Sequence, residues 1–180
     1  TEETSLKNQL SAATGGFLRR QLKRRIERIA KDITALAQEI LRRIEADEAL
    51  ARRHAILTSI VGFGPTVAAT LIACLAELGS GSRRQIAMLA GLAPVADESG
   101  ERQGLRVVWG GRPGIRRILY LAAISAARHD PGMKDFFDRL TANGKAAKVA
   151  IIAVARKLIV LANTLIAENR LYTAQPPKYA

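Results

Sequence analysis

The chain has 180 residues, a length that predicts one domain, or one domain with an appended helix. Its 28 Lys and Arg residues against 16 acidic residues give a net charge of +12, which favours a polyanionic partner: nucleic acid, or less often an anionic membrane surface. One cysteine and two histidines exclude a disulfide framework and argue against a zinc site, and the first residues do not resemble a signal peptide, so we expect a cytoplasmic protein.

The N-terminal part is predicted to be a helical arm. Residues 1–15 are expected to be a loose lead-in, and residues 16–54 a coiled-coil helix that dimerises, because apolar residues recur there at steps of three and four. These apolar residues are Leu22, Ile26, Ile29, Ile33, Leu36, Ile40 and Ile44. Neither Pro nor Gly occurs between residues 17 and 61, so one uninterrupted helix is expected. The alternative is a long helix that packs against its own domain.

A short glycine-containing segment follows the predicted arm. Gly62 and Gly64 are expected to end the first helix, and Pro65 suits the first turn of the next helix, which is expected to run to about residue 78. This is the pattern of a helix-hairpin-helix, in which glycines and the N–H groups of a helix start bind DNA phosphates. We therefore predict DNA contacts from Gly62, Gly64 and Thr66. The alternative is a tight corner between two helices that contacts no ligand.

Residues 55–170 are predicted to form a compact, mainly α-helical domain. Further helices are expected over residues 83–90, 115–128, 133–141 and 145–168, with a polar loop over 96–104 and at most a short β segment near 105–109. The apolar run from Val149 to Ala167 contains Arg156 and Lys157, which favours a buried helix over a membrane span, so no membrane partner is expected. Residues 171–180 are expected to form a flexible tail.

Ser99 is the candidate nucleophile, because it lies in a glycine-containing loop near a run of arginines. A serine hydroxyl is a weak nucleophile that needs a base or a metal, and arginines can hold a phosphodiester. The residues alone give a weak pattern, since Ser-Gly is a common turn. The basic residues predicted to contact DNA are Arg102, Arg106, Arg112, Arg116, Arg117, Lys145 and Lys148. No carboxylates or histidines converge in the sequence pattern, so no metal site is predicted in this chain.

Five short motifs follow one another in a recognisable order. They are Ile-Val-Gly-Phe-Gly-Pro at 60–65, Ala-Gly-Leu-Ala-Pro at 90–94, Ser-Gly at 99–100, Arg-Arg-Ile-Leu-Tyr-Leu-Ala-Ala at 116–123, and Gly-Lys at 144–145 with Val-Ala-Arg-Lys-Leu at 154–158. From about residue 52 to 167 the chain thereby resembles the C-terminal domain of the Piv-like insertion-sequence transposases, the bridge-RNA-guided recombinases. The heptad helix resembles the coiled coil that joins the two domains of that family.

The resemblance implies a function for the whole protein and a role for Ser99. A complete member carries an N-terminal RuvC-like domain whose four acidic residues bind magnesium. Its C-terminal serine, which by the match is Ser99, attacks DNA and forms a phosphoserine link. A bridge RNA supplies the choice of sequence, and the protein acts as a homo-oligomer, a dimer through the coiled coil or a tetramer on DNA. The acidic domain is absent from this chain, so we expect a fragment that is inactive alone.

Two hypotheses of different classes follow. In the first, the chain is the catalytic-serine half of a DNA recombinase. In the second, it is a non-catalytic helix-hairpin-helix module that binds DNA and dimerises. The second predicts salt-sensitive duplex binding that depends on Lys and Arg and is indifferent to Ser99.

Overall fold

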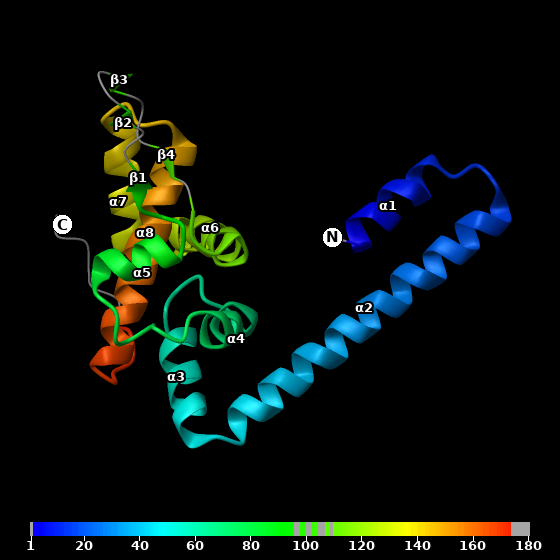
Figure 1. Ribbon diagram of the computed structural model, residues 1–180, viewed down its shortest axis with the longest axis horizontal. Helices are drawn as coiled ribbons and strands as arrows, with labels where there is room; N and C mark the ends of the chain where they lie inside the picture. The colour runs from blue at the N-terminus through cyan, green and yellow to red at the C-terminus, as the bar shows by residue number, and fades with distance from the viewer. Residues whose placement is uncertain (1, 96–97, 100–101, 104–106, 109, 174–180) are drawn as a thin grey trace. The chain divides into compact units, whose positions relative to one another are not determined.

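A computed structural model of the protein describes residues 2–95, 98–99, 102–103, 107–108 and 110–173 (Figure 1). The predicted mainly α-helical fold is confirmed, with eight helices and four two-residue strands among these residues. The chain divides into two compact units, Thr1–Ala46 and Asp47–Ala180. We refer to them as unit 1 and unit 2 and describe each by itself.

Unit 1 is a pair of helices, α1 (Glu2–Ala12) and α2 (Gly16–Glu45), that pack against each other. Leu6 is buried against Leu22, and Leu10 and Ile26 pack beside them. The prediction of a loose lead-in over residues 1–15 is therefore wrong. Two leucines one turn apart give α1 an apolar side, and the apolar seam of α2 supplies the surface that buries it.

The apolar seam of α2 is covered only along its first half. Leu22 is buried and Ile29 packs against the small cluster beneath α1. Further along the same helix, Ile33, Leu36 and Ile40 are 51%, 64% and 46% exposed. Residues spaced by three and four lie on one side of a helix, so these three form an apolar strip without cover in unit 1.

The helical arm ends earlier than the sequence predicts. Helix α2 stops at Glu45, and after a break of two residues a new helix, α3 (Glu48–Thr58), begins instead of the arm continuing to residue 54. Asp47 caps α3, because its carboxylate accepts a hydrogen bond of 2.9 Å from the N–H of Leu50. An aspartate cap satisfies a first-turn donor and so starts a helix without any Gly or Pro in the break.

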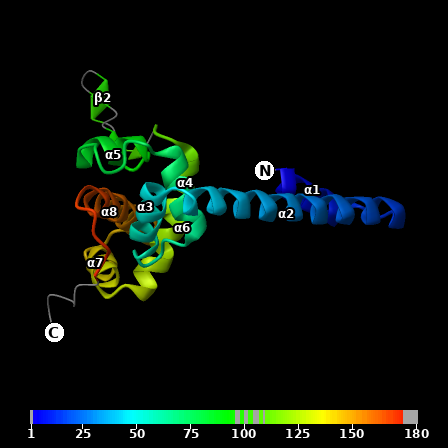
Figure 2. The same ribbon diagram turned by 90° about the horizontal axis from the view of Figure 1, so that it is seen from below.

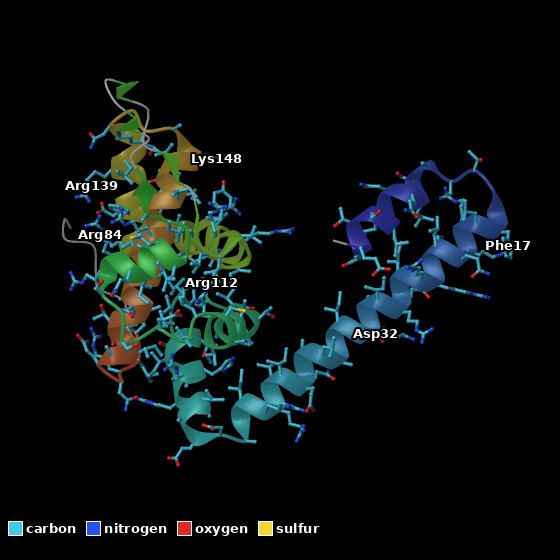
Figure 3. The ribbon with its side chains drawn as sticks, viewed as in Figure 1. Phe17, Asp32, Arg84, Arg112, Arg139 and Lys148 are labelled. Carbon is cyan, nitrogen blue, oxygen red and sulfur yellow. The ribbon has the colours of Figure 1, made fainter. Side chains whose placement is uncertain are left out.

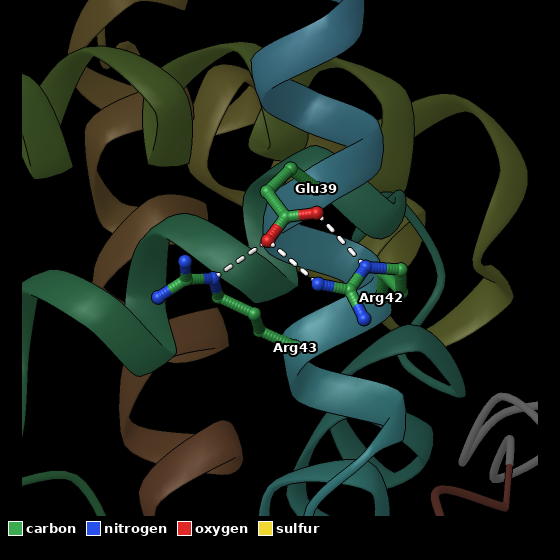
Figure 4. A network of polar contacts seen from close by, with 3 residues as sticks. All are labelled: Glu39, Arg42 and Arg43. Carbon is green, nitrogen blue, oxygen red and sulfur yellow. Dashed lines mark hydrogen bonds and ion pairs between the residues drawn. The ribbon is translucent and has the colours of Figure 1, made fainter.

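Near its C-terminal end, α2 carries a compact ion-pair network (Figure 4). The carboxylate of Glu39 accepts hydrogen bonds from Arg42, at 2.8 and 2.9 Å, and from Arg43 at 2.8 Å. These side-chain hydrogen bonds, from Arg42 first and then Arg43, lower the pKa of Glu39 from 4.5 to about 2. All three side chains are exposed, so the network adds to helix stability only modestly.

The lowered pKa of Glu39 predicts a pH dependence of helix content in α2. The ion pairs stabilise the helix fully above pH 4.5, and this contribution is lost as the pH falls from 4.5 towards 2. We expect the Glu39→Gln variant to lose less helix than the wild type across this interval, measured by circular dichroism at low salt. Glu27→Gln, at an exposed glutamate of the same helix, is the control and should follow the wild type. Equal loss in all three proteins would contradict the prediction.

Unit 2 is built around the helix α8 (Ala147–Ala167). Helices α3, α5, α6 and α7 all pack on α8, while α4 packs on α3 and α6. Their bounds are Pro65–Cys74 for α4, Arg83–Leu89 for α5, Pro113–His129 for α6 and Pro131–Ala142 for α7. Figure 2 shows α8 lying between α5 on one side and α7 on the other.

The core of unit 2 is aliphatic. Large side chains that are almost fully buried include Leu57, Leu71, Leu119 and Leu158. Among the described residues α8 is the one helix long and apolar enough to cross a membrane, but half of its apolar stretch is buried inside the unit. A central core helix meets the same criteria of length and composition, which agrees with the predicted buried helix.

The segment between α5 and α6 contains four short strands. The strands β1 (Pro94–Val95) and β4 (Val107–Val108) pair antiparallel, so part of the β segment expected near 105–109 is present. The strands β2 (Glu98–Ser99) and β3 (Arg102–Gln103) also pair antiparallel, where the sequence predicts only a polar loop. The pairing is local, and nothing in the composition of this polar segment signals it.

The chain after α8 is anchored at Tyr172, within the tail that was expected to be flexible. The hydroxyl of Tyr172 donates a hydrogen bond of 2.6 Å to Asp130, and its N–H donates to the hydroxyl of Ser59 at 2.8 Å. Asp130 is 2% exposed and also accepts from the N–H of Met133 at 2.8 Å, so it caps α7. Burial, and then the hydrogen bond to Asp130, raise the pKa of Tyr172. The rest of the predicted tail, residues 174–180, lies outside the described residues.

Candidate nucleic-acid interface

The corner between α3 and α4 holds the predicted helix-hairpin-helix residues, and its two glycines differ. Gly62 has a φ of +94°, and a Cβ there would lie 2.5 Å from the carbonyl oxygen of Ala122 in α6. Close packing on α6 therefore explains why position 62 requires a glycine. Gly64 has no heavy atom within 4 Å of a built Cβ and precedes α4 without a side-chain cap.

The start of α4 faces solvent. Gly64, Pro65 and Thr66 are all exposed. The first N–H groups of a helix have no partner within the helix, and they favour an anion such as phosphate. Of the three residues predicted for DNA contact, Gly64 and Thr66 thus stand at an exposed helix start, whereas Gly62 turns towards α6.

Three glycines close the base of the segment that carries Ser99. Gly91 and Gly111 lie against each other: a Cβ on Gly111 would be 2.2 Å from the nitrogen of Gly91. A Cβ on Gly91 would be 2.5 Å from the carbonyl oxygen of Gly110. All three have positive φ, a conformation that glycine adopts at little cost. We call Gly91, Gly110 and Gly111 the glycine base; it brings the two ends of the segment into contact.

Arg112 connects the glycine base to α4 and α5 through hydrogen bonds. Its N–H donates to the carbonyl of Leu89 at 2.8 Å, and its guanidinium donates to both carboxylate oxygens of Glu77, at 2.8 and 3.0 Å. The guanidinium also donates to the carbonyl of Cys74, at the end of α4. The hydrogen bond from Arg112 lowers the pKa of Glu77. Arg112, predicted as a DNA contact, is thus already engaged within the protein.

The central residues of the predicted site are described only in their backbone. Ser99 in β2 is the register partner of Arg102 in β3, so the two residues face each other across the antiparallel pair. The pair stands between the two ends that the glycine base joins. Arg106 lies outside the described residues. The predicted roles of Ser99, Arg102 and Arg106 stay predictions.

The remaining predicted contacts lie at two helix starts. Arg117 is exposed on α6, and Arg116 is partly buried, with its guanidinium close to Gly91. Lys145 and Lys148 are exposed around the start of α8, which has no acidic residue in its first turn (Figure 3). Positive side chains at a helix N-terminus oppose the helix dipole, so this arrangement favours an anionic partner.

Two residues that position this site were not found from the sequence. Glu77 anchors Arg112, and Gly111 packs on Gly91. Each acts through a partner at least 20 residues away, and no local pattern signals such a contact. Within the described part of the chain, no three His, Cys, Asp or Glu side chains gather where they could hold a metal ion. The family resemblance places the magnesium site in the N-terminal acidic domain of the complete protein, so this finding does not bear on that site.

Comparison with known proteins gives consistent matches. The chain is 30% identical over 158 residues to an uncharacterized 43.6 kDa protein of insertion element IS110 from Streptomyces coelicolor, covering 83% of this chain and 38% of that protein. It is 31% identical over 155 residues to an uncharacterized 42 kDa protein of insertion element IS900 from Mycobacterium paratuberculosis, covering 82% and 38%. It is 33% identical over 147 residues to the pilin gene-inverting protein of Moraxella bovis, covering 77% and 44%.

The chain therefore stands among insertion-element and gene-inverting proteins, and it spans less than half the length of these relatives. Residues 54–138 match the family described as Transposase IS116/IS110/IS902. This part of the chain is a domain of that transposase family, which confirms the resemblance found in the motifs. It includes α4, the glycine base, Ser99 and all of α6.

Proposed function

We propose that the chain is the DNA-binding, serine-bearing domain of a transposase, and that Ser99 is the nucleophile of the complete protein. The observation that carries the proposal is the position of Ser99 inside the family match, on a segment whose two ends meet at the glycine base. A nucleophile must be held in a defined geometry, and a closed, hydrogen-bonded base restricts the positions that the segment can take.

The reaction we propose is a transesterification at phosphorus. A bond forms between the Ser99 hydroxyl oxygen and the phosphorus of one phosphodiester, and the bond from phosphorus to one sugar oxygen breaks. The serine proton passes to a base, and the departing oxygen takes up a proton. Arg102, the register partner of Ser99, and Arg117 on α6 are suited to hold the phosphate charge.

The same proposal implies two binding partners, DNA and a second copy of the chain. The exposed start of α4 and the lysines at the start of α8 would hold DNA phosphates. The uncovered strip of Ile33, Leu36 and Ile40 on α2 is suited to a second copy of the chain, which would extend the predicted coiled coil. The guide RNA and the magnesium-binding domain belong to the proposal for the complete protein, as does its cytoplasmic location.

A covalent-trapping assay tests the proposal. The complete protein is incubated with magnesium, its RNA and a nicked DNA substrate that cannot be religated. We expect a protein–DNA adduct that maps to Ser99 and is lost in Ser99→Ala, while DNA binding persists. Ser80→Ala, at an exposed serine of the same unit, is the control and should keep the adduct. An adduct in Ser99→Ala would refute the assignment, and intact binding without any adduct would favour the non-catalytic module.

A further inference from the structure

Two cations share one aromatic ring on the surface of unit 2. The ammonium nitrogen of Lys157, from α8, lies 4.7 Å from the ring centre of Phe136 in α7. The guanidinium carbon of Arg139, one turn after Phe136, lies 5.6 Å from the same centre. Both cations are exposed and the ring is partly buried; Arg139 is labelled in Figure 3. We call Phe136, Arg139 and Lys157 the cation–aromatic cluster.

Neither cation of this cluster is neutralised. Among the residues that the structure describes, Arg139 and Lys157 make no ion pair, although Asp135 lies one turn before Arg139 on the same helix. Lys134 on that helix is different, because it pairs with Asp138 at 2.6 Å. Since both cations lie over one ring, they are at most about 10 Å apart. Two cations on one ring, without an ion-pair partner among the described residues, give this surface a local positive charge, which favours an anion beside them.

The cluster lies outside the residues predicted to contact DNA. Lys145 and Lys148 stand at the start of α8, whereas Lys157 lies at its middle and meets α7. Cations that meet a nucleic acid without side chains suited to base edges contact its phosphates, which position the protein without reading sequence. Proteins that bind single strands stack bases on open aromatic faces. Here the ring is partly buried and cations lie over it, so it is suited to a backbone and not to bases.

We propose that Arg139 and Lys157, held by Phe136, form a phosphate-binding site for the backbone of duplex DNA. The inference rests on the proposed DNA-binding function and adds a contact surface on α7 and α8 to it. Each cation would meet one phosphate, and the ring keeps the two side chains in position before DNA arrives. This pre-ordering lowers the entropy lost on binding.

The salt dependence of duplex binding tests the site. The 180-residue chain is titrated with a labelled duplex of arbitrary sequence from 50 to 200 mM salt, as wild type and as Arg139→Gln/Lys157→Gln. Loss of two phosphate contacts should reduce the slope of log K against log salt by about 1.8. The affinity lost by the double variant relative to the wild type should therefore be about tenfold larger at 50 mM salt than at 200 mM salt. A control with one charge removed, Lys134→Gln, should leave the slope close to that of the wild type, because Lys134 is already paired.

The possible outcomes distinguish failure of the phosphate-binding site from failure of the proposed DNA-binding function. A slope in the double variant equal to that in Lys134→Gln, with duplex binding otherwise intact, would overturn the site. Absence of duplex binding by the wild type would instead refute the proposed function on which the site rests. A larger loss for a single-stranded RNA of equal length than for duplex DNA would overturn the choice of duplex DNA. Phe136→Leu keeps both charges and should reduce affinity less than the double variant.

Discussion

Alanine in place of Gly111 is expected to destabilise unit 2 by about 3 kcal/mol, the largest effect of a single methyl group in the glycine base. The new Cβ would lie 2.2 and 2.4 Å from the nitrogen and Cα of Gly91 and 2.7 Å from the carbonyl oxygen of Met88. All three are backbone atoms, so no side-chain rotation relieves the overlap. The φ of +68° adds strain for any residue that carries a Cβ.

Gly110→Ala is the matched control for this effect. Gly110 also has a positive φ, of +76°, but nothing lies within 4 Å of its built Cβ. This variant should lose only about 1 kcal/mol, from backbone strain alone. Urea unfolding measures both losses, and amide exchange of Arg112, which bonds to Leu89, reports whether the base has opened. Equal stability of the two variants would show that contact between Gly91 and Gly111 does not matter.

Asp130→Ala is expected to cost about 3 kcal/mol and to lower the melting temperature by roughly 10 °C. The substitution removes the cap of α7 and leaves the hydroxyl of Tyr172 without its acceptor. A lost cap costs about 1 kcal/mol, and a lost hydrogen bond to a buried carboxylate costs roughly 2 kcal/mol. Thermal unfolding followed by circular dichroism gives the value.

Two further variants separate the contributions at Asp130. Tyr172→Phe keeps the cap and the ring, so it should lose about 1.5 kcal/mol through the missing hydroxyl alone. Asp135→Ala removes an exposed aspartate from the same helix and should change stability by less than about 0.5 kcal/mol. If Tyr172→Phe matched the wild type, the last residues of the described chain would not be anchored as the structure shows.

Local patterns were sufficient to predict most helices from the sequence. Pro65 and Pro113 stand in the first turns of α4 and α6, where proline costs nothing, and Ser82 caps α5 with a reciprocal bond to Gln85. Helix α1 was missed because its two leucines gain their stability from α2 and not from their own segment. The break after Glu45 contains neither Gly nor Pro, so the signals used for helix ends do not mark it; the cap by Asp47 starts the next helix.

The segment that carries the candidate site could be located from the sequence, but the contacts of its residues could not. The motif order over about residues 52–167 pointed to the segment with Ser99 and to the family whose match covers residues 54–138. The pattern could not tell that Arg112 is engaged by Glu77, which lies 35 positions away. Likewise, spacing alone does not distinguish Gly62, which packs on α6, from Gly64, which faces solvent. Such distinctions depend on tertiary packing between helices distant in sequence.

The glycine base has a consequence for how this domain can change in evolution. Residues 91 and 111 are in contact, so packing at the glycine base offsets the entropy lost when the intervening segment is closed. For a flexible loop, doubling the length adds only about 0.6 kcal/mol to that cost. The segment can therefore lengthen, shorten or exchange residues around Ser99 with little effect on the helices.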